Sequence, residues 1–230
     1  MDFTRRAELQ EWMDEPCSFE EFRDCLRDLE KANRVTMTYR PTLDFLGRAI
    51  VGRAGGLRVV DVGSGYGDML RRVSRWAARA GMDVRLTGVD LNPHAARAAR
   101  EVVGGEGITW VTGDAFSADV GDVDVVISSL FTHHLREEEV VRFLRWMEGT
   151  ARVGWFVNDL HRARVPYYLF GALARVMRWH RFVRHDGPVS IRRAFDARDW
   201  ERMILAAGLD ASAVRVREYF PARLCVERLK

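Results

Sequence analysis

A chain of 230 residues, 47% of them hydrophobic, is long enough to bury one sizeable core. No apolar run reaches the length of a membrane span and no secretory signal is present, so we expect a cytoplasmic protein with no membrane span. The net charge of +3 is carried by arginines spread among acidic residues, which argues against a nucleic-acid partner.

Helical patterns fill the beginning of the chain. Ser18 and Glu21 have the spacing of a capping box, and large apolar residues then recur at helical intervals: Phe19, Phe22, Leu26 and Leu29. A second helix is predicted from about Thr42 to Arg53. We therefore expect an N-terminal helical cap over residues 1–55, which closes over a ligand bound by the rest of the chain.

A buried strand followed by a glycine-rich turn comes next. Leu57 to Val62 is apolar and rich in valine, as expected of a parallel strand covered on both faces. The turn has glycine at positions 63, 65 and 67, which permits positive φ and lets a ligand lie against bare backbone. A helix over 68–80 then directs its N-terminal amides toward the same place, where a carboxylate would be stabilised. Asp61 would meet a cationic amine there.

A second acidic residue ends the next predicted strand. Val84 to Val89 precedes Asp90, whose carboxylate can accept hydrogen bonds from both hydroxyls of a ribose, and Asn92-Pro93 opens a helix. A dinucleotide fold is the alternative, but its G-x-G-x-x-G turn is absent, because position 68 is Asp. Asp61 would also repel a pyrophosphate. An ammonium group, a ribose and no phosphate fit S-adenosylmethionine (SAM).

The remaining elements alternate between strands and helices. Strands are predicted over 108–112, 123–128, 154–157, 214–219 and 223–229, and helices over 136–150 and 196–207. The expected fold is α/β, a seven-stranded, mostly parallel, doubly wound sheet with an antiparallel last strand. We expect residues 56–230 to form this core.

An insertion over residues 161–187 follows the fifth strand. Val165 to Met177 has a helical pattern with many large apolar groups, which suits either a core helix or a lid over the substrate. Open α/β sheets bind ligands at the carboxyl ends of their strands, where this insertion would lie. An apolar lid implies an aromatic or alkyl substrate. Candidate substrate-binding residues are Tyr39, Arg40, Phe131, Tyr167 and Tyr168.

Three motifs give the chain a resemblance to class I SAM-dependent methyltransferases. They are DVGSGYG at 61–67, TGVDLNP at 87–93 and TGDAF at 112–116, and SSLFTHHL at 128–135 resembles the loop after strand four in small-molecule members. The resemblance implies SAM as cofactor, S-adenosylhomocysteine as its product, and a contact of Asp114 and Ala115 with adenine. The cofactor-binding residues that we expect are Asp61, Gly63, Ser64, Gly65, Tyr66, Gly67, Asp90, Leu91, Asp114, Ala115, Ser128 and Ser129.

The resemblance and the apolar insertion together favour methylation of a small aromatic hydroxyl compound, such as a phenol, a quinol or a polyketide. A phenol with a pKa of about 10 needs a base at neutral pH, and histidine is suited to that role. We expect His133 to be this base, then His134, then His185. Methylation of a ring carbon, of a nucleic acid or of a protein, and SAM binding without turnover, stay open, as does the oligomeric state, a homodimer included.

No metal site is predicted. Adjacent residues such as His133 and His134 seldom bind one ion together, and no third ligand is spaced near them. The three cysteines, Cys17, Cys25 and Cys225, contain no C-x-x-C pair and are expected to be reduced thiols.

Overall fold

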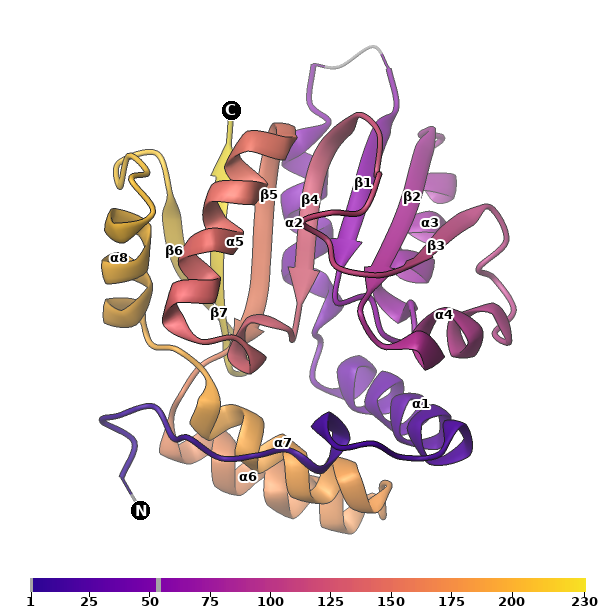
Figure 1. Ribbon diagram of the computed structural model, residues 1–230. Coiled ribbons are helices and arrows are strands. Elements are labelled where there is room, and N and C mark those ends of the chain that lie inside the picture. The colour runs from indigo at the N-terminus through magenta and orange to yellow at the C-terminus, as the bar shows by residue number, and fades with distance from the viewer. Residues whose placement is uncertain (1, 53–54) are drawn as a thin grey trace.

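The computed structural model describes residues 2–52 and 55–230 and contains one seven-stranded sheet in the order β3-β2-β1-β4-β5-β7-β6 (Figure 1). The strands are β1 (Leu57–Val62), β2 (Val84–Asp90), β3 (Ile108–Thr112), β4 (Val123–Ser129), β5 (Ala151–Leu160), β6 (Arg215–Tyr219) and β7 (Arg223–Leu229). The first five are parallel, whereas β7 runs antiparallel to both β5 and β6. This topology confirms the predicted fold class.

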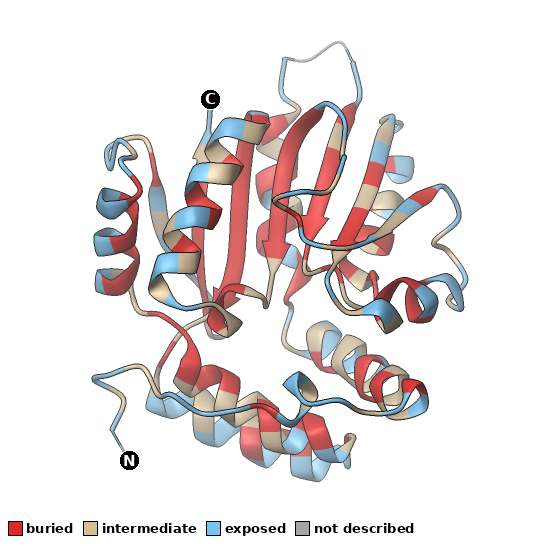
Figure 2. Ribbon diagram, viewed as in Figure 1, coloured by how far each residue is buried: buried red, intermediate tan, exposed pale blue. Residues whose placement is uncertain are grey.

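Helices cover both faces of the sheet, which explains why its central strands are continuously apolar. One face packs on α5 (Glu137–Thr150) and α8 (Ala197–Ala206), the other on α2 (Tyr39–Ala49) and α3 (Asp68–Arg79). Side chains of β1 alternate between the two cores, so Val60 packs with Trp155 and Val59 with Phe156. Figure 2 shows the central strands buried along their length.

A further layer lies at the carboxyl ends of the parallel strands (Figure 1). It consists of the short turn η1 (Trp12–Asp14) and the helices α1 (Phe19–Val35), α6 (Arg164–Val176) and α7 (Arg181–Arg193). Its own apolar cluster joins Cys25 and Ala32 of α1 to Ala174, Phe182 and Val183. On the other side, α1 contacts α4 (Pro93–Arg100). This layer covers the edge of the sheet where ligands of open α/β folds bind.

Several element boundaries differ from those predicted. Helix α2 starts at Tyr39 instead of Thr42, because Pro41 is accommodated in its first turn, where no intrahelical donor is needed. It ends at Ala49, and the predicted end at Arg53 lies outside the described residues. Strand β5 extends to Leu160, past polar residues that do not suggest a strand, because β4 pairs with it as far as Asn158 and β7 as far as Leu160.

Helix α7 runs past residue 187, the predicted end of the insertion, and continues through Pro188 to Arg193. The division into a cap over 1–55 and a core over 56–230 stays a prediction. Within the predicted cap, α2 packs on the sheet, whereas α1 lies with α7. In the described part of the chain, no helix combines the length and the apolar character of a membrane span.

Candidate active site

A cavity of about 730 Å³ lies between the carboxyl ends of the central strands and the layer formed by η1, α1 and α7. The glycine turn after β1 and the end of β2 line one part of it, and η2 (Thr132–His134), which follows β4, lines another. Most of the remaining lining is apolar, including Phe22, Leu26, Leu29, Phe131, Phe143 and Phe170. The cavity therefore has polar groups at defined places within an apolar enclosure.

The glycine turn owes its shape to packing as well as to backbone conformation. Gly63, Gly65 and Gly67 have φ values of 74°, 48° and 70°. A Cβ atom at Gly63 would lie 2.8 Å from the Phe131 ring, and one at Gly67 would lie 2.1 Å from Trp110. At Gly65 the nearest atom would be 3.8 Å away, on Leu26. Gly65 thus presents bare backbone toward the cavity, as close contact with a ligand requires.

Asp61 is buried, and its Oδ1 atom has no hydrogen-bond partner in the described structure. Burial raises the pKa of this carboxyl well above its ordinary value, and the nearby Asp68 and Asp90 raise it further. Because a buried unpaired carboxylate is costly, the site favours a cationic group beside it. The ammonium group of SAM meets that requirement.

Asp90 already accepts two backbone hydrogen bonds, one on each oxygen. Its Oδ2 accepts from Gly65 N at 2.8 Å and its Oδ1 from Asn92 N at 2.9 Å. A carboxylate oxygen has two lone pairs, so each oxygen can still accept one hydroxyl. The two backbone hydrogen bonds fix the orientation of the carboxylate, which lines the cavity and can still accept hydrogen bonds from the hydroxyls of a ribose.

The other predicted cofactor residues divide into two groups. The cavity is lined by Ser64, Tyr66, Leu91, Asp114, Ala115 and Ser129. Gly67 and Ser128 are not part of the described lining. Ser128 is buried and its hydroxyl donates to Val62 O at 2.9 Å, which ties β4 to β1. Gly67 lies at the start of α3, against Trp110.

Asp68 and Arg223 are polar residues of the cavity for which the sequence predicts no role. Asp68 accepts hydrogen bonds from Tyr39 at 2.7 Å and Asn33 at 3.0 Å, so its carboxylate joins α3 to the N-terminal helices. Arg223 is buried at the start of β7, and burial lowers its pKa to about 10. Its Nη1 has no hydrogen-bond partner in the described structure, which leaves a buried donor for an anionic group in the cavity.

His133 is buried in η2 and held by Asp159. Its Nδ1 lies 2.7 Å from Asp159 Oδ1, while Asp159 Oδ2 accepts from the Thr132 hydroxyl at 2.5 Å and His133 N at 3.0 Å. Burial opposes ionisation of Asp159, but His133 and these hydrogen bonds hold the pKa of the carboxyl below its ordinary value. Because Asp159 is then an acceptor, Nδ1 carries the proton and Nε2 is left with its lone pair.

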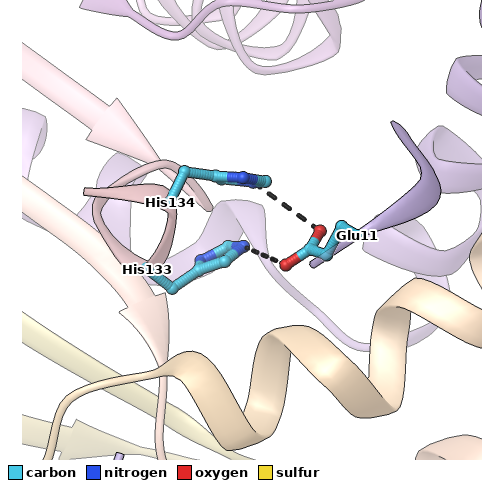
Figure 3. Close-up of side chains that lie close together, drawn as sticks. All are labelled: Glu11, His133 and His134. Carbon is cyan, nitrogen blue, oxygen red and sulfur yellow. Dashed lines mark ion pairs between the residues drawn. The ribbon is translucent and has the colours of Figure 1, made fainter. Parts of the chain in front are cut away.

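Glu11, from the N-terminal segment, faces both adjacent histidines (Figure 3). Its Oε1 lies 3.8 Å from His133 Nε2 and its Oε2 lies 3.8 Å from His134 Nε2. On the other side of His134, Nδ1 lies 3.0 Å from Asp14 Oδ1. Burial raises the pKa of Glu11 to about 7, although His134 and Arg193 lower it. Glu11 has no signal in the sequence, because it lies far from both histidines along the chain.

The ligand atoms of Glu11, His133 and His134 lie within 4.8 Å of one another, a spacing from which a metal ion could be held. The sequence offers no third ligand beside the two histidines, and the fold supplies one. However, the guanidinium of Arg193 lies 3.3 Å from Glu11 Oε1 and already places positive charge beside this carboxylate. Metal independence therefore stays our prediction.

Four residues with predicted catalytic or substrate-binding roles lie away from the described lining of the cavity: Arg40, Tyr167, Tyr168 and His185. The Arg40 side chain is 75% exposed, and Tyr168 is exposed on α6. Tyr167 packs edge-on against Phe3, and His185 stacks on Trp12. The reason is that the lining residues of the insertion come mainly from α7, whereas α6 contributes only Phe170 to the described lining. Tyr39 and Phe131 do line the cavity.

Comparisons with known proteins agree with this geometry. A family model described as "Methyltransferase domain" matches residues 59–154, from β1 into β5. No curated protein sequence matches the chain significantly.

Solved structures of methyltransferases share the fold. Magnesium protoporphyrin IX methyltransferase from Synechocystis is 16% identical, with 94% of this chain and 89% of that chain covered and a TM-score of 0.54. A plantazolicin methyltransferase solved with S-adenosylhomocysteine is 12% identical, with coverages of 91% and 95% and a TM-score of 0.66. Human N-acetylserotonin methyltransferase is 14% identical, with a TM-score of 0.65; 93% of this chain but 56% of that chain is covered.

The family match spans the glycine turn, Asp90 and the histidine pair, and the sheet has the topology of these structures. Residues 59–154 therefore form a methyltransferase domain, and the fold around them is that of class I, SAM-dependent methyltransferases.

Proposed function

We propose that this protein transfers the methyl group of SAM to the oxygen of a small aromatic hydroxyl compound, such as a phenol, a quinol or an aromatic polyketide. The supporting observation is that one cavity joins the predicted cofactor residues to His133 across a mainly apolar lining. The related structures named above are methyltransferases of magnesium protoporphyrin IX, N-acetylserotonin and plantazolicin. An aromatic body would occupy the apolar part, with its hydroxyl group beside His133.

SAM supplies a methyl group that is already activated by its sulfonium, so the protein has to align the acceptor, exclude water and remove one proton. In this proposal, His133 Nε2 accepts the hydroxyl proton while Asp159 holds the ring and stabilises the imidazolium that forms. The apolar residues around the cavity exclude water from the acceptor. In this proposal, the buried Asp61 holds the amine of the cofactor and Asp90 holds the ribose.

The first test of this proposal is a binding measurement. We expect calorimetry to show binding of SAM and S-adenosylhomocysteine and no binding of NAD, because a pyrophosphate would be repelled by the buried Asp61. Binding of NAD without a response to S-adenosylhomocysteine would exclude the proposed cofactor site.

The second test identifies the acceptor. A panel of phenols, quinols, peptides and RNA should be incubated with SAM, and the products analysed by mass spectrometry. Methyl ethers formed from phenols or quinols are expected. Products methylated at a ring carbon would be compatible with the proposed cofactor site but would show that the acceptor atom is carbon and not oxygen. Methylated RNA or peptide would exclude the proposed substrate class.

Removal of metal ions is expected to leave the methylation rate unchanged, because His133 can accept the proton and the guanidinium of Arg193 already places positive charge 3.3 Å from Glu11 Oε1. The measurement compares rates before and after dialysis against a chelator. A loss that magnesium or zinc restores would contradict metal independence, and Glu11, His133 and His134 are the cluster from which such a cation could be held.

A further inference from the structure

The N-terminal segment is fixed on α7 in a way that places Glu11 inside the cavity. Asp186 accepts hydrogen bonds from the backbone nitrogens of Trp12 at 2.9 Å and Met13 at 3.0 Å. Arg193 donates to Asp14 at 2.8 Å. Glu11 itself is 3% exposed. Because several independent contacts hold this segment, the position of Glu11 between the two histidines is a property of the fold.

Glu11 and the imidazole rings of His133 and His134 face one another with lone pairs. Asp159 and Asp14 lie at the Nδ1 atoms of His133 and His134, so these nitrogens carry the ring protons. Both Nε2 atoms then present lone pairs to the two oxygens of Glu11. The guanidinium of Arg193, 3.3 Å from Glu11 Oε1, offsets part of the repulsion among these lone pairs, and a proton shared among the three groups would offset the rest. Glu11 Oε1 indeed has no hydrogen-bond partner in the described structure.

The charged and polar groups that face Glu11 come from every element packed on it. His133 and His134 belong to η2, Asp14 to η1, and Arg193 and Ser190 to α7. Burial raises the pKa of Glu11 and the cations lower it, with a result of about 7. A carboxyl group with this pKa gains and loses its proton readily at neutral pH.

The two histidines differ in their access to solvent. The side chain of His133 is 3% exposed, whereas that of His134 is 28% exposed. A proton taken up by His133 beneath bound substrate and cofactor therefore has no direct route to water. Glu11 is the group that lies between the buried ring and the accessible one.

We propose that Glu11 relays the proton from His133 to His134, and from there to solvent, after each methyl transfer. This relay rests on the proposed function. In the transfer step, the substrate oxygen bonds to the methyl carbon, the carbon–sulfur bond breaks, and the hydroxyl proton moves to His133 Nε2. Glu11 in its acid form then accepts that proton on Oε1 and releases its Oε2 proton to His134 Nε2.

His134 passes the proton to water, and rotation of the Glu11 carboxyl group restores the starting state. The 3.8 Å gaps have to shorten by about 1 Å for direct transfer, or each gap has to be bridged by one water. The relay makes Glu11 necessary for repeated turnover and dispensable for the first methyl transfer.

The test compares a single turnover with the steady state in Glu11→Gln. We expect a burst of about one product per enzyme at nearly the wild-type rate, followed by a steady-state rate at least about tenfold lower. Added imidazole buffer should raise the slow rate at constant pH, because it accepts the retained proton. Glu8→Gln, an exposed residue of the same segment, is the matched control and should behave like the wild type.

An equal loss in the burst and in the steady state would overturn the relay and make Glu11 a residue that positions the substrate. Unchanged rates in both phases would also overturn it.

A wild-type enzyme that methylates none of the phenols contradicts the proposed function instead. In that case NMR titration of the two imidazole rings, with S-adenosylhomocysteine bound, still tests the relay. The rings should titrate in coupled steps that become independent in Glu11→Gln, and unchanged titrations would overturn the relay.

Discussion

Replacement of His133 by alanine should lower the methylation rate at neutral pH by about 10²–10⁴-fold, with little change in affinity for S-adenosylhomocysteine. The ring lines the cavity and is held by Asp159 at 2.7 Å, and its Nε2 lies 3.8 Å from Glu11 Oε1. Without it, no group in that position accepts the hydroxyl proton as the oxygen attacks. The loss should shrink as the pH approaches the ordinary pKa of a phenol, about 10, because the substrate then ionises unaided.

A second variant separates catalysis from folding. In His133→Asn, the side-chain amide can still donate to Asp159, but the atom that accepts the substrate proton is gone. This variant should fold like the wild type and lose as much activity as the alanine variant. His161→Ala and His185→Ala are matched controls, because both rings lie away from the described cavity lining. Near-normal rates for alanine at both His133 and His134 would contradict a histidine base and favour a carbon or already ionised acceptor.

The sheet could be predicted because its determinants are local. Each central strand is a short valine-rich run, as both faces are covered by helices. Helix starts are also encoded locally. The capping box of Asp196 and Asp199 precedes α8, and Asn92 caps α4 through its hydrogen bond from His94 N at 2.9 Å. The glycine turn was recognisable because its strand, its spacing and its acidic residues are contiguous.

The groups around the histidines could not be predicted, because they come from distant parts of the chain. Glu11 arrives from the N-terminal segment, Asp159 from the end of β5, and Arg223 from the start of β7. Each is a charged residue that is buried only because other elements close over it. Tyr167 and Tyr168 show the converse problem. Helical spacing identifies a helix, but it does not reveal that α7 contributes more residues to the cavity lining than α6 does.

Replacement of Asp90 by alanine should weaken binding of SAM and S-adenosylhomocysteine at least about tenfold. The carboxylate can accept up to two charge-assisted hydrogen bonds from the ribose hydroxyls, each of roughly 1.5–3 kcal/mol. It also accepts backbone hydrogen bonds from Gly65 and Asn92, so alanine releases the glycine turn as well.

Asp90→Asn distinguishes these two contributions. The amide oxygen can still accept one backbone hydrogen bond, but the negative charge and one acceptor atom are lost. We expect this variant to retain the thermal stability of the wild type and to lose a large part of the affinity, as measured by calorimetry with S-adenosylhomocysteine. The exposed Asp122, replaced by asparagine, is the control for a change of charge alone. If folded Asp90→Asn and Asp90→Ala both bind S-adenosylhomocysteine as tightly as the wild type, Asp90 does not hold the ribose, and its carboxylate serves only to shape the turn.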